Sequence, residues 1–355
     1  MGTQIGKLLV KCRQEIDYTD LYGKKVGIDA YNLIYAFLAP IRYQQTGGGY
    51  LTDSEGNVTS HLSGLFYKLT NWLPNNIRPV FIFDGKPPTF KEAEIKTRQE
   101  KKKEAVLKRE EALAKGDLES AMKFAAVTSK ITPQIIDDAK QLIEYFGLPS
   151  IQAASEAEAQ GAYMVQEGSL DAMASQDYDS FLFGSPEVIR NLTVTRRRVA
   201  TKDGLIELAP EKVNFNAVLQ ELQFTNRDQL ILLGLLVGTD YNPKGIKGIG
   251  PKTALKLVHK YPTPKALFEY LTAKYPQNEI FPFPPQMLLD YFRSPDVTES
   301  LQFKIRKPQL SKITEFLVEE RDFTKTRIEN QLKRMVVTRR KIKQKVDQQS
   351  LDRFF

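Results

Sequence analysis

Acidic residues recur at the points where apolar runs of this sequence end. The set comprises Asp29, Asp84, Glu156, Glu158, Asp177, Asp179 and Asp240. Carboxylate oxygens are the ligands that hard divalent cations such as Mg²⁺ and Mn²⁺ prefer. Carboxylates gathered in one place repel one another, and their pKa values rise unless cations are bound. The acids therefore predict a metal site built from oxygen ligands alone.

Composition excludes several other kinds of site. The chain has 355 residues, 41% of them hydrophobic, which is enough to bury a sizeable core in one large domain or two packed subdomains. One cysteine, Cys12, cannot form an internal disulfide, and two histidines, His61 and His259, cannot build a zinc cluster. No apolar run approaches the roughly 20 residues that span a bilayer, and the start of the chain lacks the features of a signal peptide. We therefore expect an intracellular, soluble protein without a membrane segment.

The charge of the chain favours a polyanionic partner. Its formal net charge is +8 and its pI is near 9.2. Lysine and arginine cluster at 101–103, 196–198 and 333–345. Nucleic acid and an anionic membrane surface both fit this balance, and solvated surface is the alternative for each run.

Four strand-like segments must position most of these acids. The segments "KKVGID", "RPVFIFD", "GLPSIQ" and "LDAMAS" each end on or shortly before one or two of them. They alternate with helical patterns, which predicts an α/β fold with a mostly parallel central sheet flanked by helices. Because sites in such sheets form outside the carboxyl ends of the strands, we expect the acids to meet at one edge.

The stretch "SEAEAQ" at 155–160 has a second interpretation. Ser155 followed three residues later by Glu158 is a capping box, and Glu156 adds negative charge at the positive end of a helix. Capping explains this pair and leaves the other acids unexplained. Because Glu156 and Glu158 would point about 200 degrees apart on a helix, we expect Glu158 to ligate metal directly and Glu156 to act partly through water.

The segment from about 90 to 130 is charged on nearly every face and too polar for a core helix. A solvated helix laced with i,i+4 ion pairs accounts for most of it. Lys91 and Arg98 lie nearly two helical turns apart and follow Asp84 closely. We expect both cations on one face of the helix, directed at the edge of the sheet where the acids meet.

A glycine-rich turn joins two helical patterns between 230 and 260. Gly245, Gly248 and Gly250 let the backbone approach a ligand closely, and Pro251 suits the first position of the second helix. The N–H groups at that helix start can meet a phosphate, as in a helix-hairpin-helix element. A tight loop without a ligand is the alternative.

Several motifs follow one another along almost the whole chain. They read "GIDAYNLIYAFL", "VFIFDGKPP", "ASEAEAQ", "SQDYDSFLFGSP", "LLVGTDYNPKGIKGIGPKTAL" and "QQSLDRFF". In these motifs the chain resembles the structure-specific 5′ nucleases, and most closely the archaeal-type flap endonucleases of the XPG-like superfamily. The resemblance implies a PIN-like 5′ nuclease fold with a helical arch and a helix-hairpin-helix-type DNA-binding element.

The resemblance also implies roles for individual residues. The seven acids would hold two magnesium ions, or manganese, with one ion lowering the pKa of a water and the other stabilising the leaving oxygen. Lys91 and Arg98 would be catalytic, stabilising charge on the scissile phosphate. Tyr35 would stack on a base near the cut, although a core aromatic is its alternative. Contacts to the downstream duplex, with a potassium ion at the turn, would involve Gly245, Gly248, Gly250 and Lys252.

The chain's last residues resemble the clamp-binding motif of the same family. They would dock on the sliding clamp PCNA through Gln348, Leu351, Phe354 and Phe355. The resemblance implies that the chain has three parts, which are a nuclease domain at 1–335, a basic flexible linker at 336–347 and the clamp-binding tail at 348–355. Within the nuclease domain we expect an N-terminal part at about 1–100, the arch at about 86–130, and an internal part at about 131–260 with the helix-hairpin-helix-type motif at 238–260.

The function implied is that of a monomeric 5′ flap endonuclease with associated 5′–3′ exonuclease activity. It would cut branched DNA with a 5′ flap during Okazaki fragment maturation and base excision repair. The absence of a lysine-rich extension after Phe355 favours an archaeal cytoplasm. A non-catalytic junction-binding clamp scaffold and a sister 5′ exonuclease are the alternatives. The acids argue against the scaffold, because bare carboxylates facing DNA weaken binding.

Overall fold

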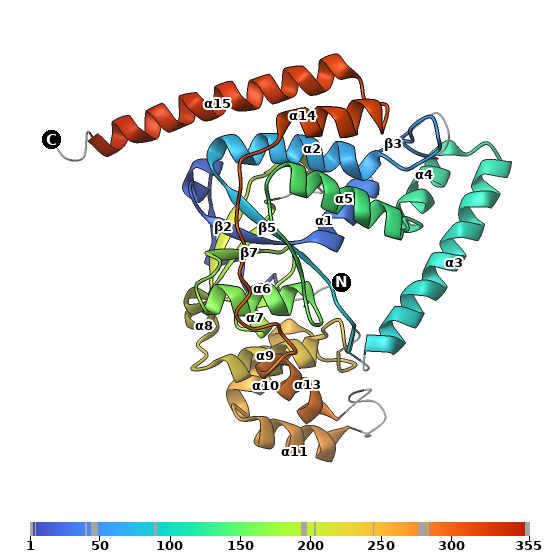
Figure 1. Cartoon of the computed structure of the whole chain (residues 1–355). Helices are drawn as coiled ribbons and strands as arrows, with labels where there is room; N and C mark the ends of the chain where they lie inside the picture. The colour runs from blue at the N-terminus through green and yellow to red at the C-terminus, as the bar shows by residue number, and fades with distance from the viewer. Residues whose placement is uncertain are drawn as a thin grey trace.

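A computed structural model shows one central sheet, with helices on both faces and a further group of helices below it (Figure 1). The structure describes every residue except 1, 2, 4, 40, 44–48, 89–90, 193–196, 202–203, 244, 276–280, 282–283 and 352–355. The segment from about 90 to 130 forms a separate pair of helices that stands at one side of the body.

The sheet has seven strands in the order β1-β11-β8-β7-β2-β5-β6. The five strands from β8 to β6 run parallel, while β11 and β1 join antiparallel at one edge. The central strands are apolar and buried on both faces, which is typical of parallel strands covered by helices. The arrangement confirms the predicted α/β class. The strands span Arg13–Glu15 (β1), Lys25–Asp29 (β2), Arg78–Phe83 (β5), Ser150–Gln152 (β6), Ala172–Ala174 (β7), Glu187–Arg190 (β8) and Glu211–Asn214 (β11).

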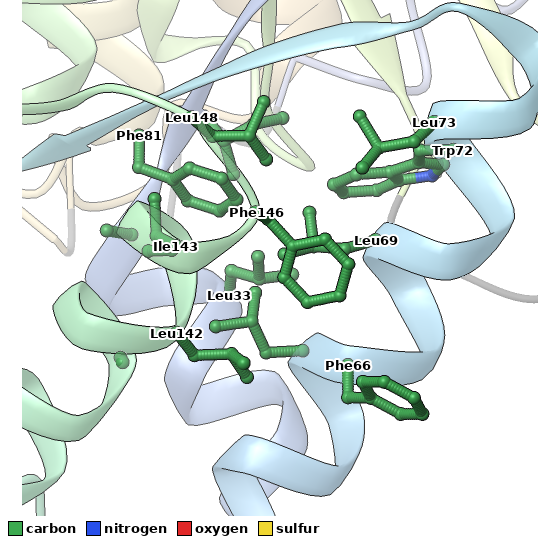
Figure 2. Packing of buried hydrophobic residues seen from close by; sticks show 14 of the residues in the cluster. Leu33, Phe66, Leu69, Trp72, Leu73, Phe81, Leu142, Ile143, Phe146 and Leu148 are labelled. Atoms are coloured by element: carbon green, nitrogen blue, oxygen red, sulfur yellow. The ribbon is translucent and has the colours of Figure 1, made fainter. Parts of the chain in front are cut away.

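One face of the sheet is covered by helices whose apolar residues share one core cluster (Figure 1). Their apolar residues recur every three or four positions and face the sheet, as the cluster in Figure 2 shows around Phe66, Leu69 and Phe146. The other face carries α6, whose small residues pack on β5 and β7. The helices are α1 (Ala30–Leu38), α2 (Ser60–Trp72), α5 (Pro133–Tyr145), α6 (Ala157–Gln166), α14 (Leu310–Thr314) and α15 (Lys325–Leu351).

A second group of helices forms a lobe below the sheet with its own core (Figure 1). Its centre is α9, which is apolar on all sides and buried throughout Gln229–Val237, as expected of a helix surrounded by others. The lobe consists of α7 (Asp179–Leu182), α8 (Phe215–Leu222), α9 (Arg227–Val237), α10 (Pro251–Lys260), α11 (Pro264–Lys274) and α13 (Pro285–Arg293).

The remaining elements are small or peripheral. The helix pair at the side comprises α3 (Glu92–Ala114) and α4 (Leu118–Val127), which pack on each other. Two hairpins pair Arg42–Tyr43 (β3) with Gly49–Tyr50 (β4), and Arg197–Thr201 (β9) with Gly204–Leu208 (β10). Short helical turns are Val10–Cys12 (η1), Tyr18–Leu21 (η2), Leu73–Asn75 (η4) and the π-helical Glu315–Glu319 (η6).

The basic segment at 336–347 is not the flexible linker that we expected. It belongs to α15, which continues without a break to Leu351 and projects past α14 (Figure 1). The segment contains neither glycine nor proline, and its lysines, arginines and glutamines are good helix formers. Helix propensity, which the prediction did not consider, therefore accounts for the helical state of this segment.

Candidate active site

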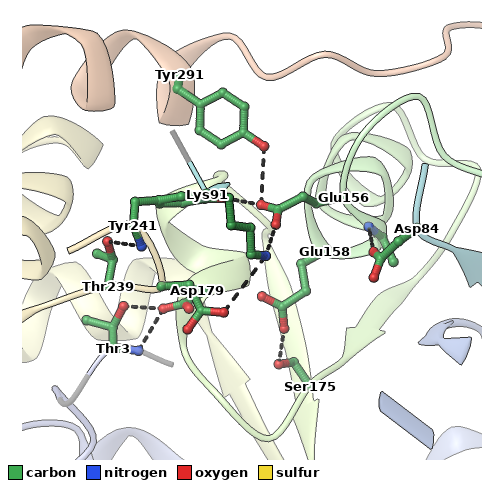
Figure 3. Close-up of polar contacts among 12 residues, drawn as sticks. Thr3, Asp84, Lys91, Glu156, Glu158, Ser175, Asp179, Thr239, Tyr241 and Tyr291 are labelled. Atoms are coloured by element: carbon green, nitrogen blue, oxygen red, sulfur yellow. Dashed lines mark hydrogen bonds and ion pairs between the residues drawn. The ribbon is translucent and has the colours of Figure 1, made fainter. Parts of the chain in front are cut away.

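The carboxyl ends of the parallel strands meet at one edge of the sheet, and the acids singled out from the sequence lie there. β2 ends on Asp29, and Asp84 follows β5 directly. Asp29 interacts electrostatically with Asp84 and Glu156. Glu158 interacts with Asp29, Asp177 and Asp179. Asp179 in turn interacts with Asp240. The fold therefore brings all seven acids into one cluster, which we call the acidic edge. Figure 3 shows four of them, Asp84, Glu156, Glu158 and Asp179.

Burial shapes the charge of the acidic edge. Asp179 is only 8% exposed, and burial is the largest cause that raises the pKa of both Asp29 and Asp179 to about 7. Neighbouring acids raise these pKa values further, Asp84 acting on Asp29 and Asp240 acting on Asp179. Burial and the charge of Asp179 hold the pKa of Glu158 well above its ordinary value. Near neutral pH the site therefore retains protons that a bound cation would replace.

Hydrogen bonds from distant elements fix several of these carboxylates (Figure 3). Thr3 donates its backbone N–H to Asp179 Oδ1 at 2.8 Å, and its hydroxyl donates to the same oxygen. Ser175 Oγ donates to Glu158 Oε1 at 2.5 Å. Thr3 and Ser175 thus hold the carboxylates of Asp179 and Glu158 in place.

The start of α6 corrects the predicted capping box. The N-cap residue is Glu156, its side chain makes no capping hydrogen bond, and Ser155 is buried. The N–H of Ala157 instead donates to Asp84 Oδ1 at 2.7 Å, so a carboxylate from the end of β5 caps α6. Because the acid comes from another strand, local spacing in the sequence could not reveal this cap.

Lys91 reaches into the acidic edge and joins two of its carboxylates. Its Nζ forms an ion pair with Glu156 Oε1 and lies 3.9 Å from Asp240 Oδ2. Burial lowers the pKa of Lys91, but Glu156 and Asp240 outweigh burial and raise it above the ordinary value. The amine therefore stays charged, and it occupies the place of a cation between two acids.

Two tyrosines contact the other oxygen of Glu156. The hydroxyls of Tyr241 and Tyr291 both donate to Oε2, the latter at 3.2 Å. Burial and the charge of Glu156 raise the pKa of Tyr291 far above its ordinary value, so its phenol stays protonated. Glu156 is thus held by Lys91 on one oxygen and by two phenols on the other.

The donors fit a hard divalent cation in kind. Every acid in the cluster offers oxygen, and the Lys91 ammonium shows that positive charge is stable between Glu156 and Asp240. Among the residues that the structure describes, however, no three acidic, histidine or cysteine side chains are grouped to hold one ion as they stand. Ligation therefore requires side-chain shifts or bridging waters, and Mg²⁺ usually keeps several waters.

Three further residues, Lys91, Arg98 and Tyr35, were also expected at this site. Lys91 is the N-cap of α3 and has helical backbone angles, so a shared face with Arg98 stays a prediction. Arg98 lies within α3, but its side chain is outside the described part of the structure. Tyr35 on α1 is 37% exposed, which argues against the core-aromatic alternative.

The glycine turn has the backbone conformation that its sequence indicates. Gly245 and Gly248 have φ values of 55° and 84°, and a Cβ on Gly245 would lie 2.5 Å from the carbonyl oxygen of Leu236. Gly250 is the N-cap of α10 and supplies no side-chain cap to the following N–H groups, and Lys252 beside it is exposed. The turn thus presents backbone donors and a cation at one helix start.

The end of the chain can be placed only in part. Gln348 is an exposed residue of α15, and Leu351 is the last residue of that helix, with its side chain outside the described set. Phe354 and Phe355 lie outside the described residues altogether. Along the described helices, none has the length and apolar character needed to cross a membrane.

Sequence reasoning missed four residues that contact the acids. Tyr241 adjoins Asp240, and Ser175 lies two residues before Asp177, so proximity in sequence could have drawn attention to both. Thr3 and Tyr291 contact acids 176 and 135 residues away, and nothing in their local sequence indicates it.

Comparisons with known proteins agree over nearly the whole chain. The family model of the XPG N-terminal domain matches residues 1–105, and that of the XPG I-region matches residues 147–240. Flap endonuclease 1 of Pyrococcus abyssi (strain GE5 / Orsay) is 46% identical over 336 residues, 94% of each chain. The same protein of Pyrobaculum aerophilum is 43% identical over 354 residues, 99% of each chain. The solved structure of flap endonuclease-1 from Methanococcus jannaschii superposes with a TM-score of 0.71 at 36% identity, over 96% of this chain and 99% of that one.

Proposed function

The chain belongs to the flap endonuclease family of XPG nucleases, and we propose that the acidic edge is the catalytic site at which it cuts 5′ flaps from branched DNA. One observation carries this proposal: seven acids and the Lys91 ammonium converge at the carboxyl ends of parallel strands. The enzyme is a metal-dependent hydrolase of DNA phosphodiester bonds. The family relationship favours it over a non-catalytic junction-binding scaffold.

The acids would hold two magnesium ions, with manganese as a substitute. Bound ions supply a water of lowered pKa and stabilise the leaving oxygen of the scissile bond. Asp29, Asp179 and Glu158 give up their protons as the cations bind, because their raised pKa values reflect burial and like charge. We keep the prediction that Glu158 ligates directly and that Glu156 acts partly through water.

Lys91 would leave its carboxylates when the scissile phosphate enters. The ammonium then stabilises the charge that develops on the phosphate, and Arg98 from the same helix would assist it bidentately. The helices α3 and α4 would form the arch that passes the free 5′ strand. Tyr35, exposed on α1, would stack on a base near the cut.

The lobe below the sheet would hold the downstream duplex. Gly245, Gly248, Gly250 and Lys252 present backbone N–H groups and charge to the phosphates, and a potassium ion at this turn is part of the proposal. Beyond the nuclease domain, α15 would carry a clamp-binding tail to PCNA through Gln348, Leu351, Phe354 and Phe355. The enzyme would act as a monomer in an archaeal cytoplasm, in Okazaki fragment maturation and base excision repair.

Cleavage of four labelled DNA substrates tests this function. We expect efficient cutting of a 5′ flap at its junction in Mg²⁺, weaker 5′–3′ exonuclease action at nicks and blunt ends, little cutting of a bubble, and none with EDTA. Preference for blunt ends over the flap would identify a sister 5′ exonuclease instead. Flap binding without cleavage in any divalent metal would contradict the proposal and support the scaffold.

A further inference from the structure

Tyr291 comes from a part of the chain that neither family model covers. It lies on α13, in the lobe below the sheet, beyond residues 1–105 and 147–240. Its helix is anchored by the fully buried side chains of Leu288, Leu289 and Phe292 and packs against α9. This anchorage turns Tyr291 toward the acidic edge, as Figure 3 shows.

The ring of Tyr291 is held by other aromatic side chains. It packs edge-on against Phe183 at a centroid distance of 5.7 Å and against Tyr241 at 5.3 Å. Such edge-to-face pairs favour one ring orientation. These ring contacts from the lobe therefore help to set the direction of the Tyr291 hydroxyl.

The Tyr291 hydroxyl contacts Glu156, whose carboxylate makes no capping hydrogen bond to α6. Although Glu156 is the N-cap of α6, its carboxylate makes no capping bond. Tyr291 and Tyr241 donate to Oε2, while Oε1 pairs with the Lys91 ammonium that also approaches Asp240. The phenols thus fix one oxygen and leave the other directed at a place where positive charge already sits.

We propose that Tyr291 is a positioning residue, whose hydroxyl orients the Glu156 carboxylate so that Oε1 faces the cation site. The inference rests on the proposed function for the metal-binding role of Glu156. Hydrogen-bond donors behind a ligating carboxylate commonly raise metal affinity by holding the ligand in place. Tyr291 also ties the lobe that carries the glycine turn to the acidic edge, since α10 and α13 both pack against α9.

The variant Tyr291→Phe tests the proposal because it removes the hydroxyl and keeps the ring. Mn²⁺ binding to the DNA-free protein, measured from the free Mn²⁺ signal by electron paramagnetic resonance, should weaken on the order of tenfold. The Mg²⁺ concentration for half-maximal flap cleavage should rise by the same factor. The rate at saturating Mg²⁺ and the melting temperature without metal should stay near the wild-type values.

Two further variants separate positioning from a general effect of losing a phenol. Tyr270→Phe removes a hydroxyl that accepts from Lys274 Nζ at 2.9 Å in the same lobe, and it should change neither metal readout. Combining Tyr291→Phe with Glu156→Gln should weaken Mn²⁺ binding no further than Glu156→Gln alone. If Tyr291→Phe weakens Mn²⁺ binding by the same factor in the Glu156→Gln protein as in the wild-type protein, the hydroxyl does not act through Glu156.

Unchanged Mn²⁺ affinity and an unchanged Mg²⁺ midpoint in Tyr291→Phe would overturn the inference. A slower maximal rate with unchanged Mn²⁺ affinity would overturn it as well, since positioning of a ligand must appear in metal binding. Failure of the proposed function is recognised separately, because the wild-type protein would then not cut a flap in Mg²⁺.

Discussion

Two aspartates at opposite ends of the same sheet show what burial does to charge. Asp171 lies at the amino ends of the strands, where it accepts hydrogen bonds from the backbone N–H of Lys25 at 2.7 Å and from Lys24 Nζ at 3.0 Å. Burial raises the pKa of Asp171, but these donors outweigh burial and lower it. Asp179 at the carboxyl ends is more deeply buried, and acids surround it, so its pKa rises to about 7.

The side chains around the two edges also differ in charge and in burial. At the amino ends, a hollow is lined by basic side chains, and Arg78, Lys304 and Arg306 there are exposed to solvent. At the carboxyl ends, the acids are buried or half-buried beside one another. Exposed charges interact weakly through water, whereas buried like charges remain costly until an opposite charge arrives. The comparison teaches that the acidic edge concentrates buried like charge, while the amino edge is ordinary charged surface.

The largest expected difference between the edges is in cleavage. Asp84→Asn keeps an oxygen that can cap α6 but removes a candidate ligand, so flap cleavage should fall on the order of a thousandfold or more, about 4 kcal/mol of transition-state stabilisation. Asp171→Asn is the matched control at the amino edge, and its cleavage should stay within about twofold of wild type. Single-turnover rates on a labelled flap in saturating Mg²⁺ measure both. Similar losses in the two variants would erase the distinction between the edges.

Lys91 should give the next largest effect. Lys91→Ala removes the cation that we place on the scissile phosphate, so the single-turnover rate should drop about 100- to 1000-fold. Binding of the flap in Ca²⁺ should change only a few-fold. Lys108→Ala is the control, because Lys108 is an exposed lysine farther along α3 that faces Glu104, and its rate should be unchanged. A normal rate in Lys91→Ala would remove this residue from the catalytic machinery.

The stabilisation of the fold by Mg²⁺ should depend on pH, because two acids of the acidic edge titrate near pH 7. Because the pKa values of Asp29 and Asp179 rise from 3.8 to about 7 on folding, the folded chain holds more protons than the unfolded chain between these values. Their contribution to stability is complete below about pH 4 and is lost as pH rises through about 7. Mg²⁺ should therefore raise the melting temperature more at pH 7.5 than at pH 5.

Melting curves with Mg²⁺ or EDTA at each pH isolate this effect. Burial lowers the pKa of His61 from 6.5 to about 4, which destabilises the fold as pH falls through that window with or without metal. Subtracting the EDTA curve cancels the His61 effect. An Mg²⁺-induced shift of the same size at pH 5 and pH 7.5 would contradict the assigned protonation of the acids.

The amino edge should show the smallest effect. Replacing Arg78 and Arg306 together by alanine removes two exposed cations, so flap cleavage in physiological salt should remain within about twofold of wild type. Salt-dependent filter binding should give nearly the same slope for variant and wild type. A clearly shallower slope would mean that this edge contacts DNA phosphates.

Much of the acidic edge could be predicted because each acid follows an apolar run that folds into a strand or a buried helix. The position of Asp29 at the end of β2 and of Asp84 after β5 follows from the alternation of strands and helices alone. The glycine turn was equally predictable, since Gly245 and Gly248 need conformations that favour glycine.

The contacts that hold the acids could not be predicted in the same way. Thr3 and Tyr291 contact acids 176 and 135 residues away, and such long-range pairs leave no periodic signal in one sequence. The cap on α6 was misassigned to Ser155 for the same reason, since Asp84 supplies it from another strand. The helical state of 336–347 could have been predicted from its composition, since the segment lacks glycine and proline and is rich in good helix formers.

One paired measurement on Asp179→Asn tests the metal-site account most directly. The substitution removes a carboxylate charge that burial and its neighbours make costly, and an amide oxygen can still accept from Thr3. We predict that the variant binds a 5′ flap in Ca²⁺ as tightly as the wild-type protein and fails to cut it in Mg²⁺. Cleavage of the labelled flap by Asp179→Asn at the wild-type rate would contradict the assignment of the acidic edge as the catalytic metal site.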